Sequence, residues 1–270
     1  MSGLPDPGVD ATPKPETVAV AERYARRRQL GLYSILRPEV IRGTQEWQRA
    51  LLDMLRSHGG YTDVDLKRLK LVDVGCGYGG HLLDFLRFGF LPSNLTGVEL
   101  LAERVDGARG KLPAAIALHH GDASTADLPD GSQDFVFQSV VFSSLLDDGF
   151  QRELADRMWR WVRPGGAVLW YDFMVDNPRN PDVRGVPRRR IQTLFPEGRM
   201  TVRRVTLAPP ISRRVCRISP LAYGVFNALP FLRTHLLCWI AKPSFEPFAT
   251  KPGVVMTHAQ VDALRDAEGI

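Results

Sequence analysis

Hydrophobic residues follow two alternating patterns over most of the 270-residue chain. Short apolar runs bounded by turn residues, typical of buried strands, occupy residues 70–74, 95–99, 115–119, 134–142 and 167–173. Stretches with apolar residues at helical spacing occupy residues 80–89, 101–109 and 150–162. Strands that alternate with helices pair in parallel, so the pattern predicts an α/β fold. We expect a doubly wound sheet that binds its ligand at the carboxyl ends of the strands.

The pattern differs towards both ends of the chain. Trp47, Leu51 and Leu55 form an apolar stripe in a region predicted to be helical, and the run "THLLCWIAKP" predicts a final strand. The expected organisation is a Pro/Gly-rich disordered leader (1–17), an N-terminal helical cover (18–60), an α/β domain (61–243) with covering insertions at 174–200 and 211–232, and a C-terminal tail (244–270) with one short helix at best.

The net charge of +5 is unevenly distributed. Residues 184–217 contain ten arginines and a single acid, Glu197. Such a cluster indicates an anionic partner, for which a carboxylate, a phosphate, nucleic acid and a lipid head group all qualify. The alternative is a basic surface that only contacts solvent.

The cysteines and the apolar content limit the class of protein. Cys76, Cys216 and Cys238 are far apart and lack CxxC spacing, which predicts neither disulfides nor a zinc site and indicates a reducing, cytoplasmic location. We expect no metal. The most apolar late stretch, residues 221–241, is interrupted by a proline and two basic residues, so it does not predict a membrane span. Peripheral membrane contact stays open, as does the oligomeric state.

Residues 71–86, "LVDVGCGYGGHLLDFL", predict a strand, a glycine turn and a helix. The spacing of the glycines also fits a dinucleotide-binding turn. Asp73 argues against that reading, because a carboxylate there would repel a pyrophosphate but attract a cationic ligand. Glu99, at the end of the second predicted strand, is suited to accept hydrogen bonds from both hydroxyls of a ribose.

Five segments follow one another along the chain: "VDVGCGYGG" (72–80), "GVE" (97–99), "GDA" (121–123), "FQSVVFSSLL" (137–146) and "RPGG" (163–166). Through these segments, in this order, the chain resembles class I S-adenosylmethionine-dependent methyltransferases. The resemblance covers roughly residues 65–243 and implies a Rossmann-like, seven-stranded sheet with an antiparallel last strand. It implies S-adenosyl-L-methionine as cofactor. The residues it places at that cofactor are Asp73, Gly75, Gly77, Gly79, Glu99, Leu100, Asp122, Ala123, Gln138 and Ser139.

The antiparallel last strand that the resemblance implies would begin beside the end of the fifth strand. His235 would then lie near Asp172, and we expect His235 to act as a general base that Asp172 orients. A half-buried His235 with a backbone partner is the structural alternative. His81, after the glycine turn, is a further candidate with a similar alternative. The residues expected to contact the acceptor are Tyr24, Tyr33, Arg189, Arg190, Arg213 and Arg214.

A looser resemblance, through "LFP…VTLAPPISR…LPFLRTHLLCWIAKP", is to bacterial O-methyltransferases of polysaccharide and secondary-metabolite pathways. It implies O-methylation of a small molecule or glycan, and the arginines suggest that this acceptor carries an anionic group. The chain lacks an Asn/Asp-Pro-Pro-aromatic loop and a Pro-Cys pair, which argues against amino methylation of bases and against cytosine C5 chemistry.

Three alternatives stay open. An RNA methyltransferase would use the basic cluster, although the cluster lacks interleaved aromatic residues for base stacking, so nucleic acid is not the expected partner. An NAD-dependent oxidoreductase is disfavoured by Asp73. A non-catalytic scaffold of the same fold would bind the cofactor weakly or not at all.

Overall fold

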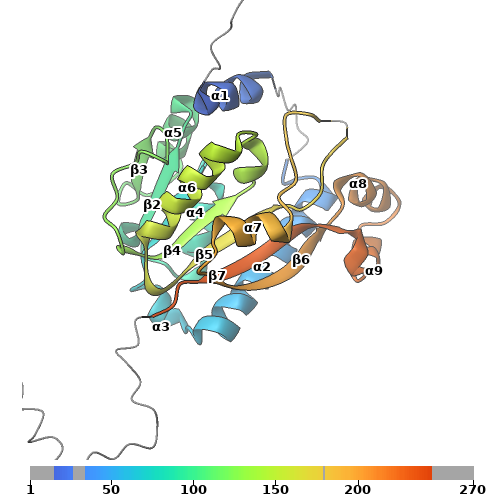
Figure 1. The fold of residues 1–270 in the computed structure, drawn as a ribbon. Helices are drawn as coiled ribbons and strands as arrows, with labels where there is room; N and C mark the ends of the chain where they lie inside the picture. The colour runs from blue at the N-terminus through green and yellow to red at the C-terminus, as the bar shows by residue number, and fades with distance from the viewer. Residues whose placement is uncertain (1–14, 27–33, 179, 245–270) are drawn as a thin grey trace, which may run out of the picture.

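The computed structural model describes residues 15–26, 34–178 and 180–244. One seven-stranded sheet with helices on both faces runs through the molecule (Figure 1). Its strands are β1 (Leu71–Val74), β2 (Leu95–Glu99), β3 (Ala117–His120), β4 (Gln133–Ser139), β5 (Val162–Phe173), β6 (Arg199–Leu207) and β7 (Arg233–Ala241). They lie in the order β3-β2-β1-β4-β5-β7-β6. The first five strands pair in parallel, and β7 is antiparallel to both β5 and β6. The predicted Rossmann-like sheet with an antiparallel last strand is confirmed.

Nine α-helices and three short 3₁₀ helices lie in the described residues. The α-helices are α1 (Glu16–Arg26), α2 (Pro38–Gly59), α3 (Asp63–Leu66), α4 (Gly80–Phe88), α5 (Ala102–Arg109), α6 (Asp148–Trp161), α7 (Arg188–Leu194), α8 (Pro209–Ile218) and α9 (Ala222–Asn227). The 3₁₀ helices are η1 (Pro92–Asn94), η2 (Phe142–Ser144) and η3 (Pro230–Leu232). No helix in this part of the chain is long and apolar enough to cross a membrane.

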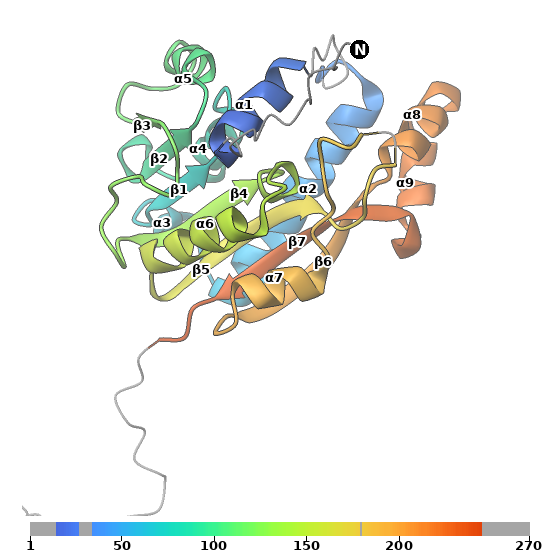
Figure 2. The same cartoon turned by 45° about the horizontal axis from the view of Figure 1, so that its top comes forward.

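The two faces of the sheet have separate cores. The helices α2 and α4 bury Leu51 and Phe85 against one face, and α6 and α7 bury Met158 and Ile191 against the other (Figure 2). Successive side chains of a strand point to opposite faces. The side chain of Tyr171 in β5 therefore points to the α2 face, and those of its two neighbours point to the α6–α7 face.

Several boundaries differ from the expectation. The helix α1 begins at Glu16, inside the expected leader, and α2 begins at Pro38. Proline suits the first turn of a helix because its missing N–H has no intrahelical acceptor there. The strand β5 begins at Val162, earlier than expected. The remaining leader (1–14), Tyr33 and the C-terminal tail from residue 245 lie outside the described residues.

Candidate active site

A cavity of about 560 Å³ opens at the carboxyl edge of the parallel strands. Doubly wound sheets bind their ligands at this edge, because the loops that follow adjacent strands converge there. The sheet supplies Gly75 after β1, Glu99 of β2, Ser139 of β4, Tyr171 and Phe173 of β5, Thr206 and Leu207 of β6, and His235 of β7. Residues of α1, α2, α5, α6 and α8, of the segments that follow β2, β3 and β4, and of the segments 175–178 and 180–185 also line it.

The turn after β1 can only be built from glycine at two of its positions. Gly75, Gly77 and Gly79 have φ angles of 70°, 55° and 80°, in the left-handed region that glycine tolerates. A Cβ at Gly75 would lie 2.5 Å from a methyl group of Val141, and one at Gly79 would lie 2.7 Å from Leu112. Gly75 lines the cavity, whereas Gly77 and Gly79 lie outside its lining and shape the turn.

Asp73 is a buried carboxylate without a hydrogen-bond partner among the described residues. Its side chain is 1% exposed, and neither of its oxygens accepts a hydrogen bond from this part of the chain. Burial, and the nearby carboxylate of Glu99, raise the pKa of Asp73 well above its usual value. Asp73 precedes Val74 and Gly75, which line the cavity, and is itself outside the lining. A positively charged ligand group in the cavity would relieve the cost of this unpaired carboxylate.

Glu99 lies at the cavity wall. Its Oε2 accepts a hydrogen bond from Gly77 N at 2.8 Å, and its Oε1 accepts one from Leu101 N at 2.9 Å. Each carboxylate oxygen has a further lone pair, so both can still accept from ligand hydroxyls. Leu100, the next residue, also lines the cavity.

Two further strand ends contribute predicted cofactor residues. Asp122 and Ala123 line the cavity after β3, and Asp122 Oδ1 is held by Ser124 N at 2.8 Å. Ser139 also lines the cavity, and its hydroxyl lies 3.1 Å from His81 Nε2. The structure contradicts a lining position for Gln138, which is fully buried and outside the cavity lining.

Gln138 holds the backbone together instead. Its Oε1 accepts from Val141 N at 3.1 Å and its Nε2 donates to Tyr171 O at 3.4 Å. These bonds fix the end of β4 against the end of β5. Gln138 therefore contributes to the shape of the cavity by holding these two strand ends in place, without lining the cavity itself.

His235 lies where the predicted topology places it, at the start of β7 and opposite Phe173. Its ring stacks on Tyr171 with centroids 4.9 Å apart and an interplanar angle of 9°. Thr234 Oγ1 lies 3.2 Å from its Nδ1. Burial lowers the pKa of His235 to about 3, so the imidazole is neutral near pH 7. A neutral, stacked ring that lines a cavity can accept or donate one hydrogen bond but is a weak base.

The predicted pairing of Asp172 with His235 is wrong. The two residues lie on opposite faces of the sheet, because Asp172 pairs with Leu236 and not with His235 in the β5–β7 register. Asp172 instead accepts hydrogen bonds from Ser143 N at 3.0 Å and Phe173 N at 2.8 Å. Burial raises its pKa to about 7. Asp172 therefore holds the segment after β4 in place and does not orient the imidazole.

Of the four arginines predicted to contact the acceptor, only Arg213 lines the cavity. Arg190 donates to Gln151 Oε1 and to the backbone oxygen of Asp148, which places its guanidinium on α6. Arg189 and Arg214 are exposed outside the lining. The expected convergence of arginines is thus contradicted except at Arg213. No hydrogen bond or ion pair within the described residues engages the Arg213 side chain.

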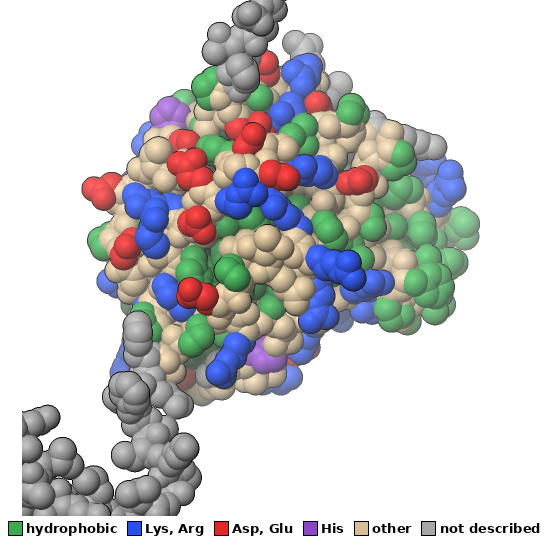
Figure 3. All heavy atoms as spheres, in the orientation of Figure 1, with side chains coloured by type: hydrophobic (Ala, Val, Ile, Leu, Met, Phe, Trp, Pro, Cys, Tyr) green, Lys and Arg blue, Asp and Glu red, His purple; other side chains and the backbone are tan. Residues whose placement is uncertain are grey.

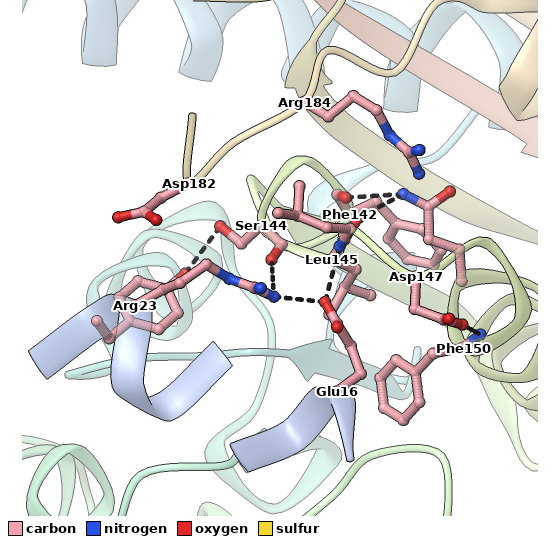
Figure 4. Close-up of polar contacts among 12 residues, drawn as sticks. Glu16, Arg23, Phe142, Ser144, Leu145, Asp147, Phe150, Asp182 and Arg184 are labelled. Carbon is pink, nitrogen blue, oxygen red and sulfur yellow. Dashed lines mark hydrogen bonds and ion pairs between the residues drawn. The ribbon is translucent and has the colours of Figure 1, made fainter. Parts of the chain in front are cut away.

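The helix α1 covers the cavity and is anchored to the segment after β4 (Figure 4). Arg23 donates to Ser144 O at 3.0 Å and pairs with Glu16. Glu16 in turn accepts from Leu146 N at 2.7 Å. Tyr24 lines the cavity as predicted, with its hydroxyl 3.2 Å from Ser144 Oγ.

Several lining residues were not predicted. Trp47 and Glu39 come from α2, Arg104 from α5, and Thr206 from the end of β6. Trp47 belongs to the apolar stripe that predicted a core helix, and its ring also lies 4.6 Å from that of His81. Arg104 lies 4.2 Å above the ring of Tyr24. No spacing rule separates such residues from core or surface positions, because the fold alone brings these helices to the edge.

No group of three or more His, Cys, Asp or Glu residues in the described part of the chain could hold a metal ion.

Comparison with known proteins now bears on this cavity. Residues 72–170 match the family model of a methyltransferase domain. The match covers β1 to β5, and thus the glycine turn, Glu99, Asp122 and the end of β4. Residues 72–170 therefore form a methyltransferase domain.

Curated relatives of this methyltransferase domain are varied. A fatty-acid O-methyltransferase of Mycolicibacterium smegmatis is 32% identical over 48% of this chain and 45% of its own length. A trans-aconitate 2-methyltransferase of Paracidovorax citrulli is 30% identical over 42% of each chain. A phthiotriol/phenolphthiotriol dimycocerosates methyltransferase of Mycobacterium ulcerans is 30% identical over 50% of this chain and 49% of its own. The chain therefore spans half or less of the length of these relatives.

Solved structures share the fold. A geranyl diphosphate C-methyltransferase from Streptomyces coelicolor, solved with S-adenosyl-L-homocysteine, has a TM-score of 0.56 and 18% identity. It covers 86% of this chain, and 98% of its own chain is matched. A protein from Pyrococcus horikoshii has a TM-score of 0.55 at 14% identity, over 81% of this chain and 99% of its own.

The residues of the methyltransferase domain fit S-adenosylmethionine. The ligand carries an ammonium and a sulfonium, and the unpartnered carboxylate of Asp73 lies behind the turn that would face them. Glu99 offers oxygen acceptors to a ribose at the cavity wall. Asp122 and Ala123 border the adjoining part of the cavity, where an adenine would lie.

Proposed function

We propose that this protein transfers a methyl group from S-adenosylmethionine to an oxygen of an acceptor that has an apolar body and an anionic group. One observation carries the proposal. Arg213 lines the same cavity as Glu99, and no hydrogen bond or ion pair within the described residues engages its guanidinium. An unpaired arginine that borders a cavity favours a carboxylate or phosphate oxygen as its partner.

Most of the lining around Arg213 is apolar. The acceptor side of the cavity includes Val40, Phe173, Val175, Val183, Leu207 and Pro209. Such walls favour a hydrocarbon body, and a few polar groups then fix its orientation. A lipophilic acid fits this lining better than a glycan does.

The ionised carboxylate of the acceptor is the nucleophile that we favour. A hydroxyl needs a base to take its proton, and the low pKa of His235, about 3, makes its buried imidazole poor at this task. A carboxylate oxygen is already anionic near pH 7. Two relatives, the fatty-acid O-methyltransferase and the trans-aconitate 2-methyltransferase, are named for acidic acceptors.

Catalysis would then depend mainly on positioning. The sulfonium supplies an activated methyl group when the cofactor is bound. Glu99 and Asp122 would fix the nucleoside, Arg213 would hold the acid, and the stacked rings of His235 and Tyr171 would form a rigid wall beside the reacting oxygen. The cover formed by α1 would exclude water.

Replacing Arg213 tests the proposal. With dodecanoic acid as acceptor, we expect Arg213→Gln to raise KM at least about tenfold, because a charge-assisted hydrogen bond contributes roughly 1.5–3 kcal/mol. The Kd for S-adenosylhomocysteine should stay unchanged. Arg214→Gln, one position along α8 and exposed, is the matched control and should leave KM unaltered. Equal KM values for the two variants, or methylation of dodecanol in preference to the acid, would contradict the proposal.

The RNA alternative gains no support from the basic cluster. Arg184 pairs with Asp148, and Arg203 with Asp53, so part of the cluster is neutralised by acids of other elements. Arg213 faces the cavity. The cluster does not form one continuous basic surface.

A further inference from the structure

Large hydrophobic side chains gather on the surface formed by the end of α8, by α9 and by η3. Figure 3 shows them over the region of α8 and α9 in Figure 1. The exposed fractions are 88% for Ile218, 77% for Leu221, 71% for Val225, 41% for Phe226, 42% for Leu229 and 71% for Phe231. We call these six residues the α8–α9 surface.

The exposure does not come from a poorly packed segment. Cys216 and Tyr223 are buried with Leu207 in a small core of their own. The hydroxyl of Tyr223 donates to Glu46 Oε2 of α2 at 3.0 Å, which ties α9 to the body of the domain. The inner sides of α8 and α9 are thus packed, and the α8–α9 surface is the outer side. A contiguous exposed apolar surface of this kind marks an interaction site.

The charged residues of the segment that carries the α8–α9 surface, 209–232, are all arginines. Arg214 and Arg217 are exposed on α8, and no ion pair within the described residues engages either of them. The sequence has no aspartate or glutamate between Glu197 and Glu246. Exposed apolar side chains next to unpaired arginines, on a segment that contains no acid, complement a surface that has anionic head groups above a hydrocarbon layer.

We propose that the α8–α9 surface docks this protein on an anionic lipid bilayer. Val225, Phe226 and Phe231 would lie at the boundary between head groups and acyl chains, and Arg214 and Arg217 would bind lipid phosphates. The same helix α8 places Ser212 and Arg213 at the cavity. Docking would therefore bring the cavity beside the hydrocarbon layer, from which a lipophilic acceptor can enter. Only this last step rests on the proposed function; the docking itself does not.

Vesicle co-sedimentation of the full chain tests the proposal without cofactor or acceptor. We expect binding to vesicles of equal parts phosphatidylglycerol and phosphatidylcholine, and at least tenfold weaker binding to phosphatidylcholine alone. Raising the salt concentration should weaken the binding to anionic vesicles, because the arginines act through screened charges. No sedimentation with anionic vesicles, or equal binding to both compositions, would overturn the proposal.

Matched variants locate the contact. Val225→Asp should lower the partition coefficient at least tenfold, whereas Val64→Asp, at a 61% exposed valine of α3, should leave it unchanged. The double variant Arg214→Gln/Arg217→Gln should lower it about 30-fold, from roughly 1 kcal/mol per arginine. The control is Arg68→Gln/Arg160→Gln, at exposed arginines of other elements. Equal losses in test and control variants would overturn the assignment to α8 and α9.

Circular dichroism melting of each variant separates loss of docking from loss of folding, and the expected result is an unchanged Tm. Light scattering of the wild type tests whether a second copy of the protein covers the α8–α9 surface instead. A dimer that Val225→Asp dissociates, in a protein that does not bind vesicles, would show that a second copy covers this surface and would overturn the proposal.

Discussion

The burial of single side chains decides which groups of this site carry charge. His235 is 4% exposed, stacked on Tyr171 and tilted against Phe173, and its pKa is lowered to about 3 because burial disfavours the imidazolium. Asp73 shows the opposite case of a carboxylate that burial makes costly to ionise. Residue type predicted both as functional, but only the fold determines how each titrates.

His235 yields a prediction about pH. Since the imidazole is neutral from pH 5 to 9, the rate with a carboxylate acceptor should show no limb near pH 6.5. His235→Asn should reduce kcat less than tenfold, whereas loss of a general base typically costs 10²–10⁴-fold. A steady-state pH profile of both proteins checks this. A kcat that falls 100-fold in the variant, with a wild-type limb near pH 6.5, would restore His235 as the base.

The lowered pKa of His235 also makes the stability of the protein depend on pH. Below pH 6.5 the unfolded chain binds a proton at His235 that the folded chain does not accept until about pH 3. His235 therefore lowers the free energy of unfolding as pH falls from 6.5 towards 3, and has no such effect above pH 6.5. His235→Asn should remove this part of the pH dependence.

At the scale of elements, the glycine turn is locked against the end of β4. A Cβ at Gly75 meets Val141 at 2.5 Å, whereas a Cβ at Gly77 meets nothing within 4 Å, and both residues have positive φ. We expect Gly77→Ala to cost about 1 kcal/mol of unfolding free energy from backbone strain alone. Gly75→Ala should cost about 3 kcal/mol, because overpacking is added.

Urea unfolding of the two alanine variants measures this difference. Adding Val141→Ala to Gly75→Ala should recover at least about 1 kcal/mol, as a double-mutant cycle would report. Equal losses for Gly75→Ala and Gly77→Ala would contradict the tight contact between turn and strand end.

Elements were more predictable than their contacts. The periods of the hydrophobic pattern located β1 to β4 and β7 to within a few residues, but β5 begins earlier than expected. Its "RPGG" segment, residues 163–166, belongs to the strand, because Gly166 fits where a Cβ would lie 2.5 Å from Asp134 O. The sheet edge shared by Asp172 and His235 was predicted correctly. Their faces were not, since one step of register reverses every side chain.

At the scale of the whole molecule, the arginines of residues 184–217 lie in several different environments. Arg184 and Arg203 form ion pairs with acids of other elements. Arg213 lines the cavity, and Arg214 and Arg217 are exposed to solvent. Sequence reports how many charges a segment has but not which way each one points. Local motifs therefore predicted much of the cavity lining at the ends of β1 to β4, whereas the rest of the lining depends on α2, β6 and α8, which only the fold brings together.

Cofactor binding is the central claim, and calorimetric titration with S-adenosylhomocysteine tests it most directly. We predict micromolar affinity for the wild type and at least tenfold weaker binding for Asp73→Asn, which removes the buried carboxylate behind the turn. Asp156→Asn, at an exposed position on α6, is the control and should bind like the wild type. No binding by the wild type, or equal affinities for Asp73→Asn and Asp156→Asn, would contradict the account.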